Sequence, residues 1–396
     1  MFDPKKWEKP TPGEMLDFIE QHKSQAKQSG NSLLVFRKHL SPLSVYKYLS
    51  ARFGRPYGFL TMARNPNDSD NLFHWDYLIK ADGVWIQIAG GNRDIHVSIF
   101  GKSMTSKDWV SFAKALKGDF QRLGSEMSRV GSTLEKWSVV PNRFSMIADA
   151  CAGFHEILVN NNNPPDFEPS KRRSASDIDK YGKRIKKLGE RAQNVFSASL
   201  SLDLMTPVLA EAFINLIIFI MRKDELKKNS RHYDYYIRQS IDARVFDLHL
   251  KCNHFKDGVN PESEEYKAFK RVMDRRNYIL HGNIDPVRDL METVYFDKFT
   301  PVFESGSDPV LDLFRKKESI IDIPGVLERY HNVHAFFSYI LSLIEEKARV
   351  EIQIMAEDSM LGYDLSRNRP GRLFSSLETM MVMPLKYDDE LNVKWR

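Results

Sequence analysis

In the first part of the chain, a short run of alternating apolar and polar residues lies between two sequences that favour turns. Residues 84–89 place Val84, Ile86 and Ile88 between Trp and Gln, which is the period of a half-buried strand. Asp82-Gly83 before this run is a typical two-residue hairpin turn. The pattern predicts a short antiparallel meander, with strands at 72–80, 84–89 and 95–100.

Helical periodicity surrounds this meander. Trp109, Phe112, Ala113 and Leu116 recur at the spacing of one helix face. Ser41-Pro42 resembles a helix start, with Ser as the N-cap and Pro at the first helical position. We expect an α+β region with helices at 14–28, 43–53, 106–116 and 143–159.

The second half of the chain shows only helical patterns. Thr206-Pro207 is a plausible N-cap and first helical residue. Long helices joined by mostly short connections are typical of a bundle. We expect four helices, at 206–228, 233–251, 261–280 and 324–355.

A break between these regions is marked by composition. Four asparagines, Asn160 to Asn163, precede Pro164-Pro165, and this run opposes both helix and strand. We find no internal repeat. The expected organisation is an α+β domain (1–159), an Asn/Pro-rich and basic linker (160–194), an all-α helical bundle (195–358) and an irregular tail (359–396) that packs on the body or on a partner.

Composition is that of a soluble globular protein. Of the 396 residues, 42% are hydrophobic and 28% are charged. Only two cysteines occur, which fits a reducing cytoplasm rather than a disulfide framework. The N-terminus lacks the apolar core of a signal peptide. The most apolar run, 208–221, is shorter than the roughly 20 residues of a spanning helix. We therefore expect a cytoplasmic protein and no membrane partner.

The net charge of +5 is concentrated in one segment. Nine basic residues between Lys171 and Arg191 face only three acidic ones. Such a patch attracts phosphate backbones, although a solvated linker face is an equally good interpretation. The candidate RNA-binding residues are Lys171, Arg172, Arg173, Lys183, Arg184, Lys186 and Lys187.

Candidate chemistry lies near the end of the third bundle helix. Arg276-Asn277 is followed by His281-Gly282, so a permanent cation, an amide and an imidazole lie within six residues. Arginine binds phosphate through paired donors, and histidine exchanges its proton near neutral pH. Arg and His have the same spacing at 244/249 and 329/334. Only in the match at 276 does Asn follow the Arg directly and Gly follow the His directly.

Two polar residues on the first bundle helix add context. Glu211 and Asn215 lie four apart on one face of an otherwise apolar helix. Buried polar groups require partners, which an Arg or His on a neighbouring helix can supply. The alternative is that both side chains are exposed or bond locally.

Together, Glu211-Ala-Phe-x-Asn215 and Arg276-Asn-x-x-x-His281 resemble the HEPN-domain ribonucleases, over about residues 195–355. The resemblance implies a helical bundle that forms a homodimer, in which Arg and His from both copies make one RNA-cleaving site. It assigns Arg276 and His281 as the catalytic pair, Asn277 as a positioning residue and Glu211 with Asn215 as support. Members of the family occur in toxin–antitoxin, abortive-infection and antiviral defence systems, which implies a regulatory protein or a phage-derived trigger.

The sequence therefore predicts a metal-independent endoribonuclease. Attack by the RNA's own 2′-hydroxyl leaves a cyclic phosphate and a 5′-hydroxyl, with His281 moving the proton and Arg276 stabilising the phosphoryl charge. No cofactor or metal is expected, since His249, Cys252 and His254 lack a second pair of ligands. The α+β domain is a candidate sensor or regulator. A non-catalytic RNA-, nucleotide- or protein-binding module is the alternative, and a dimerising scaffold is a third possibility.

Overall fold

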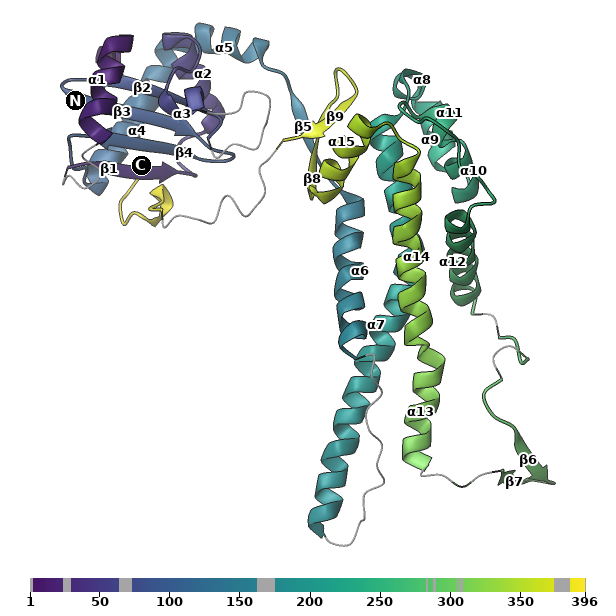
Figure 1. Ribbon diagram of the computed structural model, residues 1–396. Coiled ribbons are helices and arrows are strands. Elements are labelled where there is room, and N and C mark those ends of the chain that lie inside the picture. The colour runs from purple at the N-terminus through teal and green to yellow at the C-terminus, as the bar shows by residue number, and fades with distance from the viewer. Residues whose placement is uncertain are drawn as a thin grey trace. The chain divides into compact units, whose positions relative to one another are not determined.

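The chain folds into two compact units, seen in a computed structural model (Figure 1). Unit 1 comprises Met1–Val139, Gly362–Arg367 and Gly371–Arg396, and unit 2 comprises Val140–Leu361 and Asn368–Pro370. The structure describes residues 3–23, 30–63, 73–161, 175–282, 284–287, 290–304, 306, 309–373 and 385–395.

Unit 1 is built on a four-stranded antiparallel sheet in the order β1-β4-β3-β2. Asp82 and Gly83 both have positive φ, 45° and 82°, as a two-residue turn of this kind requires. The expected meander is therefore confirmed, and the apolar run from Ser32 adds a fourth strand that the sequence analysis did not predict. The strands are β1 (Ser32–Phe36), β2 (Trp75–Ala81), β3 (Val84–Gly90) and β4 (Ile95–Phe100).

Helices cover both faces of this sheet. Tyr77 and Ile79 share a core with the helices α2 and α4, whereas Leu78 between them packs against α1, because successive strand residues point to opposite faces. Ser41 caps α2 by accepting a hydrogen bond from the Ser44 amide, as expected. The helices are α1 (Pro12–Lys23), α2 (Pro42–Phe53), α3 (Phe59–Ala63), α4 (Ser106–Phe120) and α5 (Gly124–Thr133), with 3-10 turns at Pro4–Lys6 and Gln121–Leu123.

The C-terminal residues return to unit 1. Asp388, in the turn Asp388–Glu390, is fully buried and accepts hydrogen bonds from the backbone amides of Arg37 (3.1 Å) and His39 (2.7 Å). Leu391 enters the core and Trp395 stacks on the His39 ring, with centroids 3.9 Å apart. The tail thus packs on the body, but it is not wholly irregular: β8 (Met360–Asp364) and β9 (Arg369–Arg372) form a sheet with β5 (Trp137–Pro141).

Unit 2 is a set of long helices around α7, whose apolar side chains lie between α6, α12 and α14 (Figure 1). Phe269 of α12 and Phe336 of α14 stack at 4.2 Å. The elements are α6 (Arg143–Asn160), α7 (Ala175–Met221), α8 (Asp224–Lys228), α9 (Ser230–Ile237), α10 (Ile241–Phe246), α11 (Leu248–Lys251), α12 (Glu264–Leu280), β6 (Val294–Asp297), β7 (Thr300–Phe303), α13 (Pro309–Ile321), α14 (Ile323–Ser342) and α15 (Glu346–Glu357).

Several helix boundaries differ from the sequence predictions. Pro207 lies inside α7 instead of starting a helix, and the Thr206 hydroxyl donates to the Leu202 carbonyl, four residues back. Burial of the apolar face outweighs the loss of one backbone hydrogen bond at proline. Ser240 caps α10, so the expected helix 233–251 is three short helices. The expected helix 324–355 is likewise divided, at residues 343–345.

The boundary between the units also lies elsewhere than expected. Residues 140–159 belong to unit 2, because α6 packs along α7. Residues 175–194 of the expected linker are helical, as the first part of α7. By length and composition α7 could cross a membrane, but 61% of its most apolar window is buried in the protein. Most residues of the apolar run 208–221 are buried in the core of unit 2.

Candidate functional site

The candidate catalytic residues lie where α12 ends. His281 is the C-cap, and its backbone amide donates to the Asn277 carbonyl at 3.2 Å. Gly282 has φ +60°, the left-handed conformation expected of the residue that follows a helix. The side chains of Asn277 and His281 are both exposed. The local sequence thus presents an amide and an imidazole to solvent on one side of a helix end.

Glu211 of α7 accepts hydrogen bonds from two arginines. Its Oε1 accepts from Nη1 of Arg276 (3.1 Å), and its Oε2 accepts from Nη2 of Arg244 (3.4 Å). Arg244, whose side chain is only 7% exposed, also donates to Oδ1 of Asn215 at 2.6 Å. Arginines from neighbouring helices therefore pair with Glu211 and Asn215, as expected for facing helices, although Glu211 is only half-buried and Asn215 is exposed.

A second acid on α7 repeats this arrangement. Asp203 is buried and accepts from Nε and Nη2 of Arg329 on α14, at 2.7 and 3.1 Å. Nε of Arg275, the residue before Arg276, donates to the same carboxylate at 3.2 Å. The sequence analysis missed this cluster, although an acid two turns before Glu211 in an apolar helix was a usable signal.

The three Arg-His matches differ in their histidines, not in their arginines. Arg244, Arg276 and Arg329 all bind acids of α7. The His249 ring bonds the Phe246 carbonyl at 3.0 Å, and His334 lies edge-on to the Tyr330 ring at 4.6 Å. Among the described residues, the imidazole of His281 has no such partner. All three imidazoles are exposed, and that of His281 makes none of these contacts with the described residues.

Within one copy, Arg276 and His281 do not converge. Five residues along a helix rotate the side chain by about 140°, so the guanidinium faces α7 while the imidazole points elsewhere. No hydrogen bond joins the two side chains in the described part of the chain. A site that uses both groups needs a ligand that spans the helix end, or a second copy.

The basic candidates occupy the first turns of α7. Lys183 and Lys186 are highly exposed and form helix-surface pairs with Asp179 (2.9 Å) and Glu190 (4.0 Å). Lys187 is also exposed, and Arg184 is half-buried. These side chains make a cationic helix surface, whereas the other candidates, Lys171, Arg172 and Arg173, lie outside the described residues.

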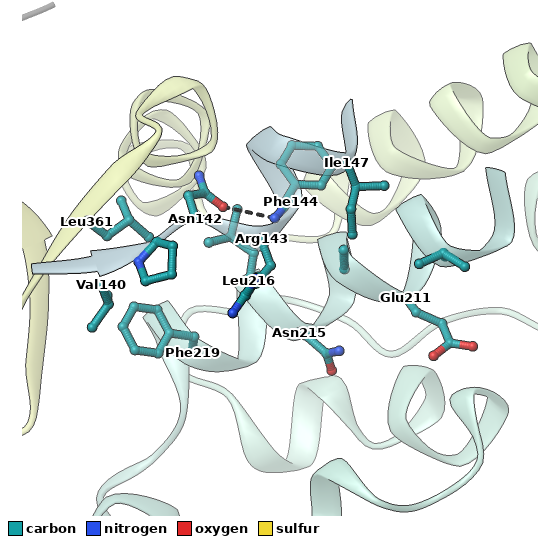
Figure 2. A pocket seen from close by; sticks show the side chains of 13 residues that line it. Val140, Asn142, Arg143, Phe144, Ile147, Glu211, Asn215, Leu216, Phe219 and Leu361 are labelled. Carbon is teal, nitrogen blue, oxygen red and sulfur yellow. Dashed lines mark hydrogen bonds between the residues drawn. The ribbon is translucent and has the colours of Figure 1, made fainter. Parts of the chain in front are cut away.

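A pocket of about 460 Å³ lies beside Glu211 and Asn215, between α7 and the start of α6 (Figure 2). We call it the α6–α7 pocket. Its walls are mostly apolar, and its polar side chains are Asn142, Arg143, Glu211 and Asn215. The apolar and aromatic wall residues are Val140, Pro141, Phe144, Ile147, Val208, Ala212, Leu216, Phe219 and Leu361.

Other titratable groups form no metal site in the described ranges. No group of three His, Cys, Asp or Glu side chains is placed there to hold a metal ion. Cys151 and Cys252 are free and buried, and burial raises the pKa of the Cys151 thiol to about 11. His155 of α6 lies against His331 of α14, with ring centroids 5.5 Å apart. Burial, followed by the charge of His331, lowers the pKa of His155.

Comparison of the chain with known protein families, curated proteins and solved structures gives no match.

Proposed function

We propose that unit 2 is a HEPN-like endoribonuclease bundle that cleaves RNA without a metal ion. The observation that carries the proposal is the pairing of Arg276 with Glu211 near the end of α12, where the exposed His281 side chain has no hydrogen-bond partner among the described residues. The carboxylate fixes the guanidinium, and the imidazole is exposed at the helix end. Asn277, one turn before His281, can orient the phosphate or the imidazole.

In this mechanism the 2′-hydroxyl of a ribose attacks the adjacent phosphorus. His281 takes the hydroxyl proton or gives a proton to the leaving 5′-oxygen, so that a 2′,3′-cyclic phosphate and a 5′-hydroxyl remain. Arg276 stabilises the charge that develops on the phosphoryl oxygens. DNA lacks the attacking hydroxyl and is not cleaved.

A homodimer completes the proposed site, because one copy keeps Arg276 and His281 apart. Support comes from the apolar segment that begins just after Gly282 and includes the β6–β7 hairpin, which we call the arm (residues 284–303). Val287 is 87% exposed, Phe296 66% and Phe299 97%. A two-stranded hairpin is marginal alone, and exposed apolar patches mark association sites. Asp285 and Asp297 make the segment unsuited to RNA, so a second copy is its proposed partner.

The exposed lysines of α7 are proposed to guide RNA towards the helix end. Lys183, Lys186 and Lys187 offer a cationic helix surface, and each phosphate contact adds to the salt dependence of binding. Their replacement should weaken RNA binding and flatten its salt dependence. An unchanged salt slope would instead make this surface a solvated helix face.

The remaining assignments belong to the same proposal. Unit 1 is proposed to sense a trigger or to restrain the nuclease, in a cytoplasmic toxin or anti-phage defence system. The alternative function is a non-catalytic module that binds RNA, a nucleotide or a protein. The open α6–α7 pocket favours this alternative, since it offers a ligand site that needs no chemistry.

A DNA strand with a single ribonucleotide tests the proposed chemistry. We expect cleavage only at the 3′ side of that ribose, leaving a cyclic phosphate and a 5′-hydroxyl. An all-DNA strand of the same sequence is the matched control. Cleavage of the control, or a 5′-phosphate product, would contradict attack by the 2′-hydroxyl.

A further inference from the structure

A cavity of about 310 Å³ lies in unit 2, where the end of α7 meets α15. We call it the α15 pocket. Ile220 and Met221 line it at the end of α7. Ala348, Glu351 and Met355 of α15 also line it and share one helix face, since they are three and four residues apart. The volume is at the lower end of the range for small-molecule sites, about 300–1,000 Å³, so a compact ligand fits.

Charges of both signs line the α15 pocket. Glu351 supplies a carboxylate from α15, whereas Lys227 of α8 and Arg369 of β9 supply two cations. Nδ2 of Asn368 donates to the Lys227 carbonyl at 3.4 Å, so the chain segments that carry the two cations lie side by side. A carboxylate and a pair of cations therefore reach one cavity from different elements.

The carboxylate and the cations do not neutralise each other. Glu351 forms no hydrogen bond or ion pair with any described residue, although it shares the cavity with both cations. The Lys227 ammonium is 3.4 Å from Asp224, whose side chain is 73% exposed, and such surface pairs contribute little. The backbone amide of Asn253 donates to the Met221 carbonyl at 2.8 Å, and its side-chain amide has no partner among the described residues. The pocket thus offers unpaired polar groups to a ligand.

These groups favour one kind of ligand. An anion alone would be repelled by Glu351, and a cation alone would be repelled by Lys227 and Arg369. His254 also lines the pocket, but its ring is already engaged, with Nδ1 at 2.8 Å from Oε2 of Glu345. The remaining walls are mostly apolar. A small ligand with an ammonium group, a carboxylate and an apolar part therefore matches the whole lining.

We propose that the α15 pocket binds a free α-amino acid with an apolar side chain. The Glu351 carboxylate accepts from the ligand's ammonium group, and Lys227 and Arg369 donate to its carboxylate. The methionine and aliphatic walls contact its side chain. The inference goes beyond the proposed RNA cleavage and does not rest on it, since neither Arg276 nor His281 lines this pocket.

Calorimetry of the full chain with leucine, methionine and phenylalanine tests the inference. Two analogues of leucine separate the charges: 4-methylpentanoate lacks the amine, and 3-methylbutylamine lacks the carboxylate. Glu351→Gln removes the acid and keeps its shape, and the double variant Lys227→Met/Arg369→Met removes both cations. Glu346→Gln is the matched control, because Glu346 is exposed on the same helix and does not line the pocket.

Circular dichroism verifies the fold of each variant. Glu351 is exposed and has no partner among the described residues, so Glu351→Gln should fold like wild type and remains informative if the double variant misfolds.

We expect saturable binding of at least one of these amino acids to wild type, and much weaker binding of both analogues. Glu351→Gln and the double variant should each weaken binding roughly tenfold or more, as for a lost charge-assisted contact. Glu346→Gln and His281→Ala should bind like wild type, so the result does not depend on nuclease activity. No binding of any of the amino acids, equal binding of either analogue, or full binding by Glu351→Gln would overturn the inference, even if RNA is cleaved.

Discussion

Arg276 on α12 donates a hydrogen bond to Glu211 on α7, with 3.1 Å between Nη1 and Oε1. Because the other carboxylate oxygen accepts from Arg244, one acid holds guanidinium groups from two other helices. The arrangement fixes the direction of the Arg276 side chain and leaves the end of α12 open. Glu211 and its arginines therefore also have a structural role, and their contribution to stability can be measured separately from RNA cleavage.

Glu211→Ala should destabilise unit 2 by about 2–4 kcal/mol, because it leaves the buried Arg244 without its carboxylate. Thermal unfolding followed by calorimetry measures the change. Asp179→Ala is the matched control, since its exposed pair with Lys183 on the same helix contributes less than about 1 kcal/mol. Equal effects of the two substitutions would mean that the Glu211 network adds no stability.

Asp388→Ala should destabilise unit 1 by about 2–3 kcal/mol, because several amide donors at residues 37–39 lose a buried acceptor. Calorimetry of the full chain again reports the loss. The neighbouring Asp389 pairs with the exposed Arg37, so Asp389→Ala should cost much less stability than Asp388→Ala. An Asp388→Ala protein as stable as wild type would show that the tail does not anchor this unit.

Unit 2 should lose stability in mild acid through His155. The Nε2 atom of this histidine is buried without a partner, and burial lowers its pKa below the ordinary value of 6.5. Protonation therefore favours the unfolded chain. The stabilisation is complete above pH 6.5 and is lost as the pH falls from there towards the folded pKa.

The measurement is the midpoint of thermal unfolding of unit 2 at pH values between about 7.5 and 5. His155→Phe, which keeps a ring against Tyr330 but cannot be protonated, should flatten this dependence. The same slope in wild type and variant would place the acid-sensitive group elsewhere.

The arm should control association. Replacing Phe296 and Phe299 with Ser removes two exposed aromatic side chains from the proposed dimer contact. Light scattering should show a dimer for wild type and a monomer for the variant, which should also lose RNA cleavage. Leu250→Ser, at an exposed site on α11, is the control and should remain dimeric. A monomeric wild type that cleaves RNA would contradict a site shared by two copies.

Much of the fold follows from local patterns. Alternation at Val84, Ile86 and Ile88 and the turn Asp82-Gly83 predicted the meander, because such signals act over a few residues. Helix continuity was harder to predict. At Thr206-Pro207 the local start signal is overridden by packing against α6, α12 and α14, and this packing depends on residues far away in the sequence.

The candidate site, like the fold, could be predicted in part from the sequence. The spacing of Glu211 and Asn215 on an apolar helix indicated a polar partner, and the structure supplies Arg244 and Arg276. The choice of Arg244 could not be read from the sequence, since three arginines share the same motif spacing. Asp203 was missed because no motif includes it.

RNA cleavage by wild type and His281→Ala, with EDTA present, tests the central claim most directly. His281 caps α12 with its backbone and has an exposed side chain, so the variant should fold like wild type. We predict that wild type cuts RNA to fragments with cyclic phosphate ends and that His281→Ala leaves the RNA intact. Equal cleavage by both proteins, or loss of wild-type cleavage on chelation, would contradict a site built on this histidine.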